Sequence, residues 1–563
     1  MNFDLRHTPF SRYGSYIAFS HLPKSEARPE GLYMRTVHGN ALFREVFLVE
    51  LLQGKKPIPF KEIATPTVLR LENERGHVDI CIAEPKLVRI KGSGVGIRLR
   101  MATDVYGSAI SVGDHRWEVN SYANQIKYML IPMKGRLLMD APWSMGKCDY
   151  IVADFLPQPG IGVVECAIEE FPCVWYERSY DESFDNCVKS MQSEYQRWLD
   201  KTPQAPKAYS KVQELAAYTQ WSCVVSPEGH LTRPAMYMSK NWMTNVWSWD
   251  NCFNAMALVY KNPELAWDQF MLLIDNQDKS GVFPDSLNDK SMMWNFCKPP
   301  IHGWSLRWMM ERTDFINKQR LKEVYEPLCR WTQWWFKYRD HDHDGIPQYN
   351  HGNDSGWDNS TVFDEGVPIE GPDLCAYLII QMDTLSEIAS KLGEKNDAKN
   401  WKSRADELLE KMLAHSWRGD GFVAPRSGDH HVAESDSLLL FLPIILGPRL
   451  PEGVLTELVV GLSKKGRFLT EHGLTTESLK SPLYQANGYW RGPIWAPSTM
   501  IIVEGLAAAA KKEFARKISR KFCDMVARSG MAENFDALTG TGLRDPAYTW
   551  TSSVLLILAH EYL

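Results

Sequence analysis

Residues 378–392, which read LIIQMDTLSEIASKL, decide the fold class of the larger part of this chain. Apolar side chains recur there at intervals of four, three, four and three residues: Leu378, Met382, Leu385, Ala389 and Leu392. This spacing places them on one face of a helix. Gly393 follows at once, and glycine is suited to end a helix because it adopts a left-handed backbone at little cost. The pattern predicts a helix over residues 372–392.

Segments of the same kind recur throughout the chain after Pro206. About twelve of them are predicted as helices, near 208–226, 249–260, 263–277, 302–312, 321–339, 372–392, 397–416, 434–446, 452–463, 494–509, 512–528 and 546–562. Joined as antiparallel hairpins, they fit a closed double ring of six inner and six outer helices, an (α/α)6 barrel. A right-handed superhelix of helical repeats is the alternative, but no repeat period is visible.

The first third of the chain has a different pattern. Short runs rich in Val, Ile, Tyr and Thr predict strands at Leu42 to Glu50, Thr67 to Leu71, Val78 to Ala83, Leu87 to Ile90, Val95 to Arg100 and Ile151 to Leu156. We therefore predict a mainly α protein in which an antiparallel β-sandwich over residues 1–190 precedes the barrel. A linker is expected over 191–207, where two prolines lie between Lys201 and Lys207, and the barrel is expected over 208–563.

Composition limits the classes of partner. The chain has 563 residues, and its charge is 63 − 69 = −6, so it has no electrostatic pattern for nucleic acid or an anionic membrane. Eleven cysteines without C-x-x-C pairs indicate reduced thiols. The first ten residues lack the pattern of a signal peptide, and the longest apolar stretch, Leu438 to Leu446, contains a proline. These features predict a soluble, cytoplasmic protein.

Tryptophans beside acids mark candidate site residues. Seventeen of the 21 tryptophans lie from Trp221 onward, and such flat side chains suit stacking on the apolar faces of sugars, although they also fill helical cores. Trp247-Ser248-Trp249-Asp250 comes directly before an apolar helix. Asp250 is either the N-terminal cap of this helix or a residue that holds a pair of sugar hydroxyls.

A second segment combines an acidic turn with another Trp-Asp pair. Asp340, Asp342, Asp344 and Gly345 match positions 1, 3, 5 and 6 of a calcium-binding loop, with a carbonyl available at Ile346. The twelfth position is His351 rather than glutamate, so a structural calcium would need a more distant carboxylate, and the alternative is a solvated acidic turn. Gly356-Trp357-Asp358-Asn359-Ser360 follows. The adjacent pair His430-His431 points in two directions, which favours structural or surface use over metal binding.

The third segment, Tyr489-Trp490-Arg491-Gly492-Pro493-Ile494-Trp495, opens a helix, and Glu533 follows in a short polar turn. In a closed ring of hairpins the loops converge on one mouth, so Asp250, Asp358 and Glu533 can meet there. Two carboxylates suit glycoside hydrolysis if one stays protonated and the other ionised. We expect burial against Trp357 to raise the pKa of Asp358 and nearby donors to keep Glu533 charged. The sequence has no G-x-S-x-G, G-x-x-x-x-G-K-[ST] or H-E-x-x-H motif.

These motifs, together with Lys298-Pro299-Pro300 and Glu533-Asn534-Phe535-Asp536, occur in the order that resembles glycoside hydrolase family 63, over residues 210–563. That family includes processing and bacterial α-glucosidases and the mannosylglycerate and glucosylglycerate hydrolases. The resemblance implies an inverting mechanism without a cofactor, with Asp358 as general acid and Glu533 as general base, their carboxyl groups about 6.5–9.5 Å apart. It also implies a calcium-binding turn at Asp340, Asp342 and Asp344, and a sugar pocket lined by Trp247, Trp249, Asp250, Trp357, Asn359, Trp490, Arg491, Gly492 and Trp495.

The hypothesis is therefore an inverting, exo-acting α-glycosidase for a short oligosaccharide or small α-glycoside, with an α-glucosidase as the first choice. The compact glycerate-conjugate hydrolases lack a substantial N-terminal domain, and this chain has one. An α-mannosidase, a mannosylglycerate or glucosylglycerate hydrolase, a trehalase and an α-L-rhamnosidase stay open as alternatives. A sugar-binding protein without catalysis is the alternative from another class, although both carboxylates are present.

Overall fold

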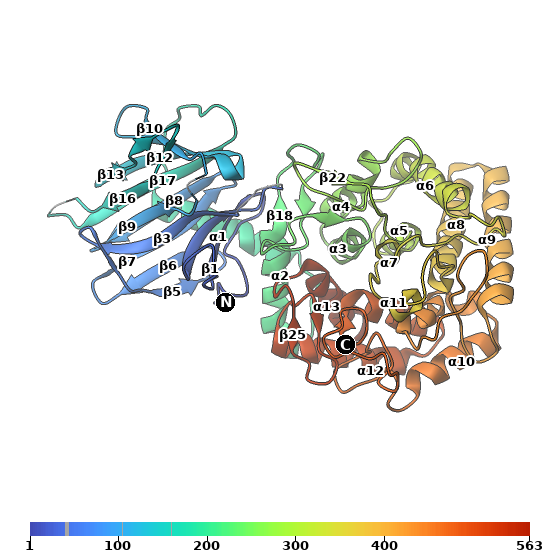
Figure 1. Cartoon of the computed structure of the whole chain (residues 1–563). Coiled ribbons are helices and arrows are strands. Elements are labelled where there is room, and N and C mark those ends of the chain that lie inside the picture. Colours follow the sequence, from blue (N-terminus) through green and yellow to red (C-terminus); the bar gives the residue numbers. More distant parts are fainter. Residues whose placement is uncertain (40–43, 104, 159) are drawn as a thin grey trace.

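The computed structural model describes residues 1–39, 44–103, 105–158 and 160–563. Leu42, at the start of the first predicted strand, lies outside the described residues. Figure 1 shows a β-sheet region, in blue, beside a ring of helices that runs from green to red. With 37% helix and 23% strand, the chain is a mixed protein, so the expectation of a mainly α protein was wrong. The β-region alone supplies two large sheets, which raises the strand content.

The β-region consists of two antiparallel sheets, counted over the described residues. The seven-stranded sheet contains β1 (Ile17–Leu22), β2 (Gly31–Thr36), β3 (Glu45–Gln53), β9 (Gly96–Met101), β16 (Val152–Leu156) and β13 (Arg136–Asp140) in this order, with β4 (Lys56–Ile58) paired to β3. The eight-stranded sheet contains β10 (Ser108–Ser111), β11 (Trp117–Ser121), β12 (Ile126–Lys134), β17 (Val163–Phe171), β8 (Leu87–Ser93), β7 (Gly76–Glu84), β6 (Leu69–Asn73) and β5 (Lys61–Ala64). Each predicted strand lies in one of these strands, with its ends displaced by a few residues.

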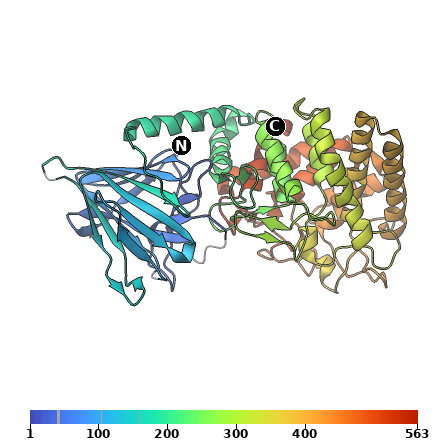
Figure 2. The same cartoon turned by 90° about the horizontal axis from the view of Figure 1, so that it is seen from above.

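A helix occupies part of the predicted linker. Helix α1 (Phe184–Asp200) is capped by Ser183, whose side chain accepts from the backbone N–H of Asn186. Its buried residues recur at helical spacing: Phe184, Cys187, Met191, Tyr195 and Trp198. This face packs on β7 and β8, and Figure 2 shows α1 lying along the sandwich before the chain enters the ring. Residues 191–200 of the predicted linker therefore lie in α1, which has its own apolar face to bury.

Twelve helical segments form two concentric layers within the described residues. The inner layer consists of α3 (Asp250–Leu258), α5 (His302–Met310), α8 (Pro372–Leu392), η4 (Leu438–Arg449), α11 (Ala496–Ala508) and α13 (Thr549–Tyr562). Each inner segment packs against the next, and α13 packs against α3, so the ring is closed. The outer layer consists of α2 (Ser210–Cys223), α4 (Pro263–Asp275), α6 (Lys318–Tyr338), α9 (Lys395–Ser416), α10 (Glu452–Ser463) and α12 (Lys512–Ser529). The predicted (α/α)6 ring is confirmed.

Composition explains which helices lie inside. All nine residues of α3 are buried, whereas α12 alternates buried apolar residues with exposed lysines and arginines. A helix without a polar face is stable only where neighbours cover it all round. One inner segment departs from the prediction, because η4 is a 3-10 segment rather than an α-helix over 434–446. Pro443 and Pro448 explain the difference, since a proline inside a helix lacks the N–H for its hydrogen bond.

The remaining elements are short: η1 (Tyr122–Asn124), β14 (Trp143–Ser144), β15 (Lys147–Cys148), η2 (Lys207–Tyr209), β18 (Val224–Val225), β19 (Ala235–Met236), β20 (Val246–Trp247), β21 (Ser286–Leu287), β22 (Met292–Met293), α7 (Gly352–Ser355), η3 (Thr361–Phe363), β23 (Ile494–Trp495), β24 (Asn534–Phe535) and β25 (Gly542–Leu543). Among the described residues, none of the helices has the length and apolar character needed to cross a membrane.

A buried charged triad joins the sandwich to the ring. His38, just after β2, lies 2.7 Å from Asp289 through Nδ1 and 3.2 Å from Glu170 through Nε2, and its ring stacks on Tyr16. Burial acts to lower the pKa of His38, but the charge of Glu170 and the hydrogen bond to Asp289 outweigh burial and raise it to about 9. The protonated histidine therefore stabilises the junction of the two regions.

The triad predicts a pH-dependent stability. The folded pKa of about 9 lies above the ordinary histidine value of about 6.5, so the stabilisation is fully present below about 6.5 and lost as the pH rises to 9. Over that window we expect the wild type to lose on the order of 1–3 kcal/mol of unfolding free energy that a His38→Gln variant does not lose. Urea unfolding at several pH values measures the difference. His77→Gln, a change at a partly exposed histidine of the same sandwich, is the control and should keep the wild-type slope.

Candidate functional site

The segments singled out in the sequence lie at one end of the ring. The segment ending at Trp249 leads into α3, Lys298 precedes α5, Trp495 precedes α11, and Glu533 lies in the connection that enters α13. The inner segments alternate with outer ones along the chain, so their N-terminal ends lie on the same side. Helix N-termini carry partial positive charge, which favours carboxylates at this end.

The first acid lies on the floor of the site. Asp250 is the first residue of α3 and only 3% exposed, and the cap position is occupied by Trp249, so the interpretation of Asp250 as a cap is not supported. The hydroxyl of Tyr548 donates to its carboxylate at 3.3 Å. Burial raises the pKa of Asp250 to about 8. Beside it, β20 pairs with β21, and the backbone N–H of Ser248 donates to the carbonyl of Asp285, which brings a further buried acid to the floor.

Lys298 connects this floor with Asp358. Its ammonium group lies 3.1 Å from Asp285, donates at 2.8 Å to the carbonyl of Asn353, and lies 4.0 Å from Asp358. Burial raises the pKa of Asp358, as expected, and the charge of Lys298 opposes the increase. The side-chain amide of Asn353 faces both carboxylate oxygens of Asp358, with 2.7 and 3.0 Å separations when its nitrogen is the donor. Because an amide also offers an oxygen acceptor, Asn353 is able to serve Asp358 in either protonation state.

Glu533 lies on the opposite side of the aromatic segment. Strand β23 pairs with β24, which sets Trp495 opposite Asn534, the residue after Glu533. The backbone N–H of Glu533 donates at 2.7 Å to the carbonyl of Asp545, and its carbonyl accepts from the indole of Trp550. Glu533 is 3% exposed, and burial followed by the charge of Asp545 raises its pKa to about 7. The expectation that nearby donors keep it fully charged was wrong, because desolvation outweighs Arg544 and Tyr489.

All three acids act electrostatically on one further residue, Tyr489. The charges of Glu533, Asp358 and Asp250 each act on its hydroxyl, and burial together with them raises its pKa. Hydrogen bonds also connect neighbouring loops at this end of the ring. The backbone N–H of Cys297 donates to Asp354 at 3.1 Å. The hydroxyl of Tyr548, fifteen residues after Glu533, donates to Asp250. The structure thus brings together acids separated by 283 residues of sequence, since 533 − 250 = 283.

The tryptophans of the motifs pack mostly on each other. Trp490 stacks on Trp495 with ring centres 3.9 Å apart, and it contacts Trp357 at 4.7 Å. The most buried members are fully enclosed: Trp249, Trp357, Trp490 and Trp495. Trp247 is only half-buried, so it is the residue of the predicted set whose ring reaches solvent. The aromatic residues therefore form an apolar cluster beside the acids, and Trp247 alone of the five reaches solvent.

Asn359, Arg491 and Gly492 hold the loops of the site. The amide of Asn359 donates to the carbonyl of Gly488 and accepts from the backbone N–H of Trp490, both at 3.0 Å. The guanidinium of Arg491 donates to the carbonyl of Asn359 at 2.7 Å and pairs with Asp364. A side chain on Gly492 would begin 2.1 Å from the carbonyl oxygen of Gln485. These residues are thus engaged in protein contacts that fasten the acid-bearing loop to the aromatic segment.

Sequence reasoning missed several residues of the site. Lys298 entered only as part of a motif, and Asp285, Asn353 and Tyr548 did not enter as candidates. No periodicity or spacing in the sequence distinguishes these four residues from ordinary loop residues. The acidic turn, in contrast, is assembled as expected: ligand atoms of Asp340, Asp342 and Asp344 lie within 4.8 Å of one another, and Asp340 Oδ1 is buried without a partner among the described residues. These oxygens fit a bound cation.

The close contact at Gly492 predicts a stability effect. In Gly492→Ala the new methyl group meets the backbone of Gln485, which has little freedom to move, so we expect a loss of at least about 2 kcal/mol of unfolding free energy. Gly453→Ala is the matched control, because that glycine lies in α10 with open space around it and alanine favours helix by about 0.5–1 kcal/mol. Denaturant unfolding of both variants checks this, and equal stabilities would contradict the packing described.

Known proteins resemble both parts of the chain. Mannosylglycerate hydrolase MGH1 of Selaginella moellendorffii is 21% identical over 394 residues, which cover 55% of this chain and 79% of that protein. The GH63 mannosylglycerate hydrolase of Thermus thermophilus, solved in complex with glucose, aligns with a TM-score of 0.53 at 18% identity, over 61% of this chain and 99% of that chain. A bacterial glucoamylase complexed with acarbose aligns with a TM-score of 0.64 at 11% identity, over 99% of this chain and 93% of that chain. At such identities the two structures show the fold alone.

The family is shown by the sequence profile. The family described as "Mannosylglycerate hydrolase MGH1-like glycoside hydrolase domain" matches residues 243–551. The match includes every acid and tryptophan assigned above to the site, from Trp247 to Trp550. Because it spans more than half of the chain, this protein belongs to the MGH1-like glycoside hydrolases of family 63.

Proposed function

We propose that this glycoside hydrolase removes a terminal sugar from a small α-linked glycoside, with inversion, using Asp358 as general acid and Glu533 as general base. The observation that carries the proposal is that one aromatic segment joins both acid-bearing loops: the backbone N–H of Trp490 donates to Asn359, beside Asp358, and Trp495 pairs with Asn534, beside Glu533. An inverting hydrolase needs two carboxyl groups with a sugar and a water between them. The loops of α8 and α13 supply one group each.

The surroundings of the two groups support these roles. Asp358 has a side chain that is 32% exposed, so it is open to the glycosidic oxygen of an entering substrate. Its raised pKa favours the protonated form that an acid needs. Glu533 lies deeper and its pKa of about 7 leaves an ionised fraction at neutral pH, which suits a base that removes a proton from water. Tyr489 and Arg544 favour the ionised form of Glu533.

Burial also supports attack at a chain end. Asp250 and Glu533 are each only 3% exposed, whereas Asp358 and Trp247 lie toward solvent. A sugar that reaches the base therefore has to enter as a terminus, with its remainder directed outward past Asp358. Asp250 and Asp285 lie on the floor, where buried carboxylates suit the hydroxyl groups of one enclosed ring.

A glucosyl residue is our first choice for that ring, and mannosyl is the second. The names of the relatives favour conjugates with glycerate as the first substrates to test, since the similar Selaginella protein is a mannosylglycerate hydrolase. The two sugars differ in one hydroxyl, which changes one or two contacts. No cofactor takes part in the proposed reaction, and a cation at Asp340, Asp342 and Asp344 would only brace the acid-bearing loop.

A panel of glycosides, followed by proton NMR at early times, tests the proposal. It contains α-glucosides, α-mannosides, trehalose, glucosylglycerate, mannosylglycerate and an aryl α-rhamnoside. Release of the β-anomer from an α-linked substrate would support inversion and name the sugar. Initial release of the α-anomer would refute the roles of Asp358 and Glu533. If nothing is released, calorimetric titration with the same panel distinguishes a binding protein from an untested linkage.

Removal of the acid should depend on the leaving group. Asp358→Asn is expected to lower turnover of natural glycosides at least about 1,000-fold, because the leaving oxygen is no longer protonated. The loss should be much smaller with an α-glycosyl fluoride, whose leaving group needs no proton. Steady-state kinetics on both substrates and an unchanged melting temperature check the effect. Equal losses of turnover on the two substrates would show that Asp358 does not act by protonating the leaving group.

Removal of the base should affect every substrate. Glu533→Gln is expected to lower kcat at least about 1,000-fold on glycosides and fluorides alike, because water attack is common to both. In the wild type, kcat/KM should fall as the pH drops below about 7, where Glu533 becomes protonated. Asp536→Asn is the control, since the Asp536 carboxylate accepts from the N–H groups of Leu538 and Thr539 in a turn. Loss of activity in the control alone would make Asp536 the base.

A further inference from the structure

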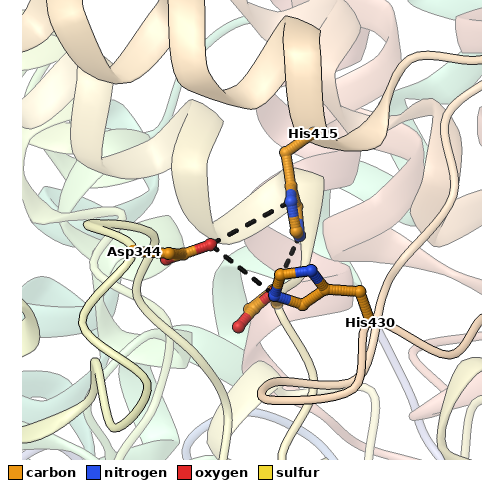
Figure 3. A group of neighbouring side chains, drawn as sticks. Asp344, His415 and His430 are labelled. Atoms are coloured by element: carbon orange, nitrogen blue, oxygen red, sulfur yellow. Dashed lines mark hydrogen bonds and ion pairs between the residues drawn. The ribbon is translucent and has the colours of Figure 1, made fainter.

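Two histidines join the acidic turn in the folded chain. Asp344 follows α6, Glu370 precedes α8, His415 lies in the last turn of α9, and His430 lies in the loop before η4. Each offers one ligand atom, and these four atoms lie within 4.8 Å of one another. Figure 3 shows both imidazole rings directed at the carboxylate of Asp344. The sequence favoured structural or surface use of the pair His430-His431. It did not predict that His430 lies beside Asp344.

The hydrogen bonds of His415 determine which of its nitrogens is free. Nε2 lies 2.7 Å from Oε2 of Glu370, so this nitrogen carries the proton and donates it to the carboxylate. Nδ1 then presents a lone pair to Asp344 Oδ2, at 4.0 Å. His430 Nε2 lies 3.9 Å from the same oxygen and 3.3 Å from Oδ2 of Asp342, so it faces two carboxylates of the acidic turn. A cation between such donors would be about 2.0–2.2 Å from each, which is the usual length of a zinc–nitrogen or zinc–oxygen bond.

Glu370 gives an independent sign of a missing positive charge. Its side chain is fully buried, and Oε1 has no hydrogen-bond partner in the described part of the chain. Oε2 is also 4.0 Å from His430 Nε2, so the carboxylate is directed at the cluster. Lys411, which reaches the acidic turn, donates to the backbone carbonyl of Asp344 rather than to a carboxylate. A buried carboxylate oxygen without a partner is costly, and a cation bound in the cluster would offset the negative charge of Glu370.

The mixture of ligand types selects the class of cation. Calcium and magnesium take oxygen ligands, whereas imidazole nitrogen together with carboxylate suits zinc and its neighbours in the first transition row. A carboxylate that accepts from the second nitrogen of a metal-bound histidine is the common arrangement around zinc. We infer that Asp344, His415 and His430 ligate a divalent transition-metal cation of the zinc type, with Glu370 orienting His415.

This site would fasten the loop that carries the proposed general acid. Asp344 and Glu370 stand at the two ends of the segment that contains Asp358, and the backbones of Tyr349 and Ile369 already pair across it. The cation would connect both ends of this segment to α9, through His415, and to the loop that carries His430. That loop already contacts the acidic turn, because the backbone N–H of Gly428 donates to Asp342. Such a bond stabilises the folded loop because the unfolded chain does not hold the ligands together. The inference concerns binding and does not depend on the proposed reaction.

Calorimetric titration of the full chain, stripped of metal by a chelator, tests the site. With Zn²⁺ we expect one ion per chain, bound at least about tenfold more tightly than Ca²⁺ and with a rise in melting temperature. Co²⁺ serves as an optical probe. Its visible absorption is expected to be stronger with nitrogen ligands than in a turn that offers only oxygen ligands. His430→Gln should weaken Zn²⁺ binding by about 10–100-fold or more. His430 is half-exposed, so this variant is expected to fold.

His431→Gln is the matched control. His431 is the adjacent residue and similarly exposed, but it pairs with Glu365 outside the cluster, so its loss should leave the affinity for Zn²⁺ within about twofold. Three results would overturn the inference: absence of Zn²⁺ binding to the wild type, tighter binding of Ca²⁺ than of Zn²⁺, or equal effects of the two histidine variants. The second result would return the site to the three aspartates and an oxygen-only cation.

Discussion

Closure of the inner ring, where α13 packs against α3, is the constraint on which the site depends. A buried chain of hydrogen bonds marks this seam: Gln220 donates to Ser553 at 2.9 Å, and Ser553 donates to Asn254 at 2.7 Å. Asn254 in turn donates to Thr549 at 3.2 Å. Buried polar groups of this kind are stable only when each finds its partner, so they specify one pairing of the last helix with the first. Without the seam, Tyr548 would not reach Asp250, and Glu533 would not face the other acids.

The site itself balances burial against charge. Burial raises the pKa values of the carboxyl groups, and the charge of Lys298 limits this effect at Asp358 and Asp285. The acids therefore differ in how readily they are protonated, which two-carboxylate chemistry requires.

The β-sandwich is attached to the same seam. Lys240 is buried and donates to Ser11 and to the carbonyl of Arg12, while Arg35 of β2 donates to the carbonyl of Lys240 at 3.0 Å. The adjacent Asn241 donates at 2.9 Å to Asp545, whose backbone carbonyl holds Glu533. A continuous series of polar contacts therefore runs from the sandwich to the proposed base. The sandwich and the ring also share one hydrophobic core.

The sequence by itself predicted the twelve helical segments of the ring, six of the fifteen strands of the two sheets (7 + 8 = 15), and the motifs that hold the acids, because periodicity and short motifs are local properties. It also singled out Asp250, Asp358 and Glu533 as candidate acids, and the roles of Asp358 and Glu533 came from the family resemblance. Helix α1 was not predicted. Its residues from Phe184 to Trp198 carry apolar side chains at helical spacing, but the prolines that follow favoured a linker. The prediction of an α-helix at η4 was also wrong, although Pro443 and Pro448 are evident in the sequence.

Only the tertiary structure decided which distant side chains meet. Lys298 among the acids, Asn353 against Asp358, and His415 and His430 against Asp344 all come from loops of different hairpins. The pKa of Glu533 likewise depends on burial and on the charge of Asp545, which lies twelve residues away in the chain. The physical reason is that spacing along the chain sets which face of a helix is apolar, whereas ring closure and strand pairing between loops set the contacts. Desolvation and charge, which control the chemistry, follow from those contacts.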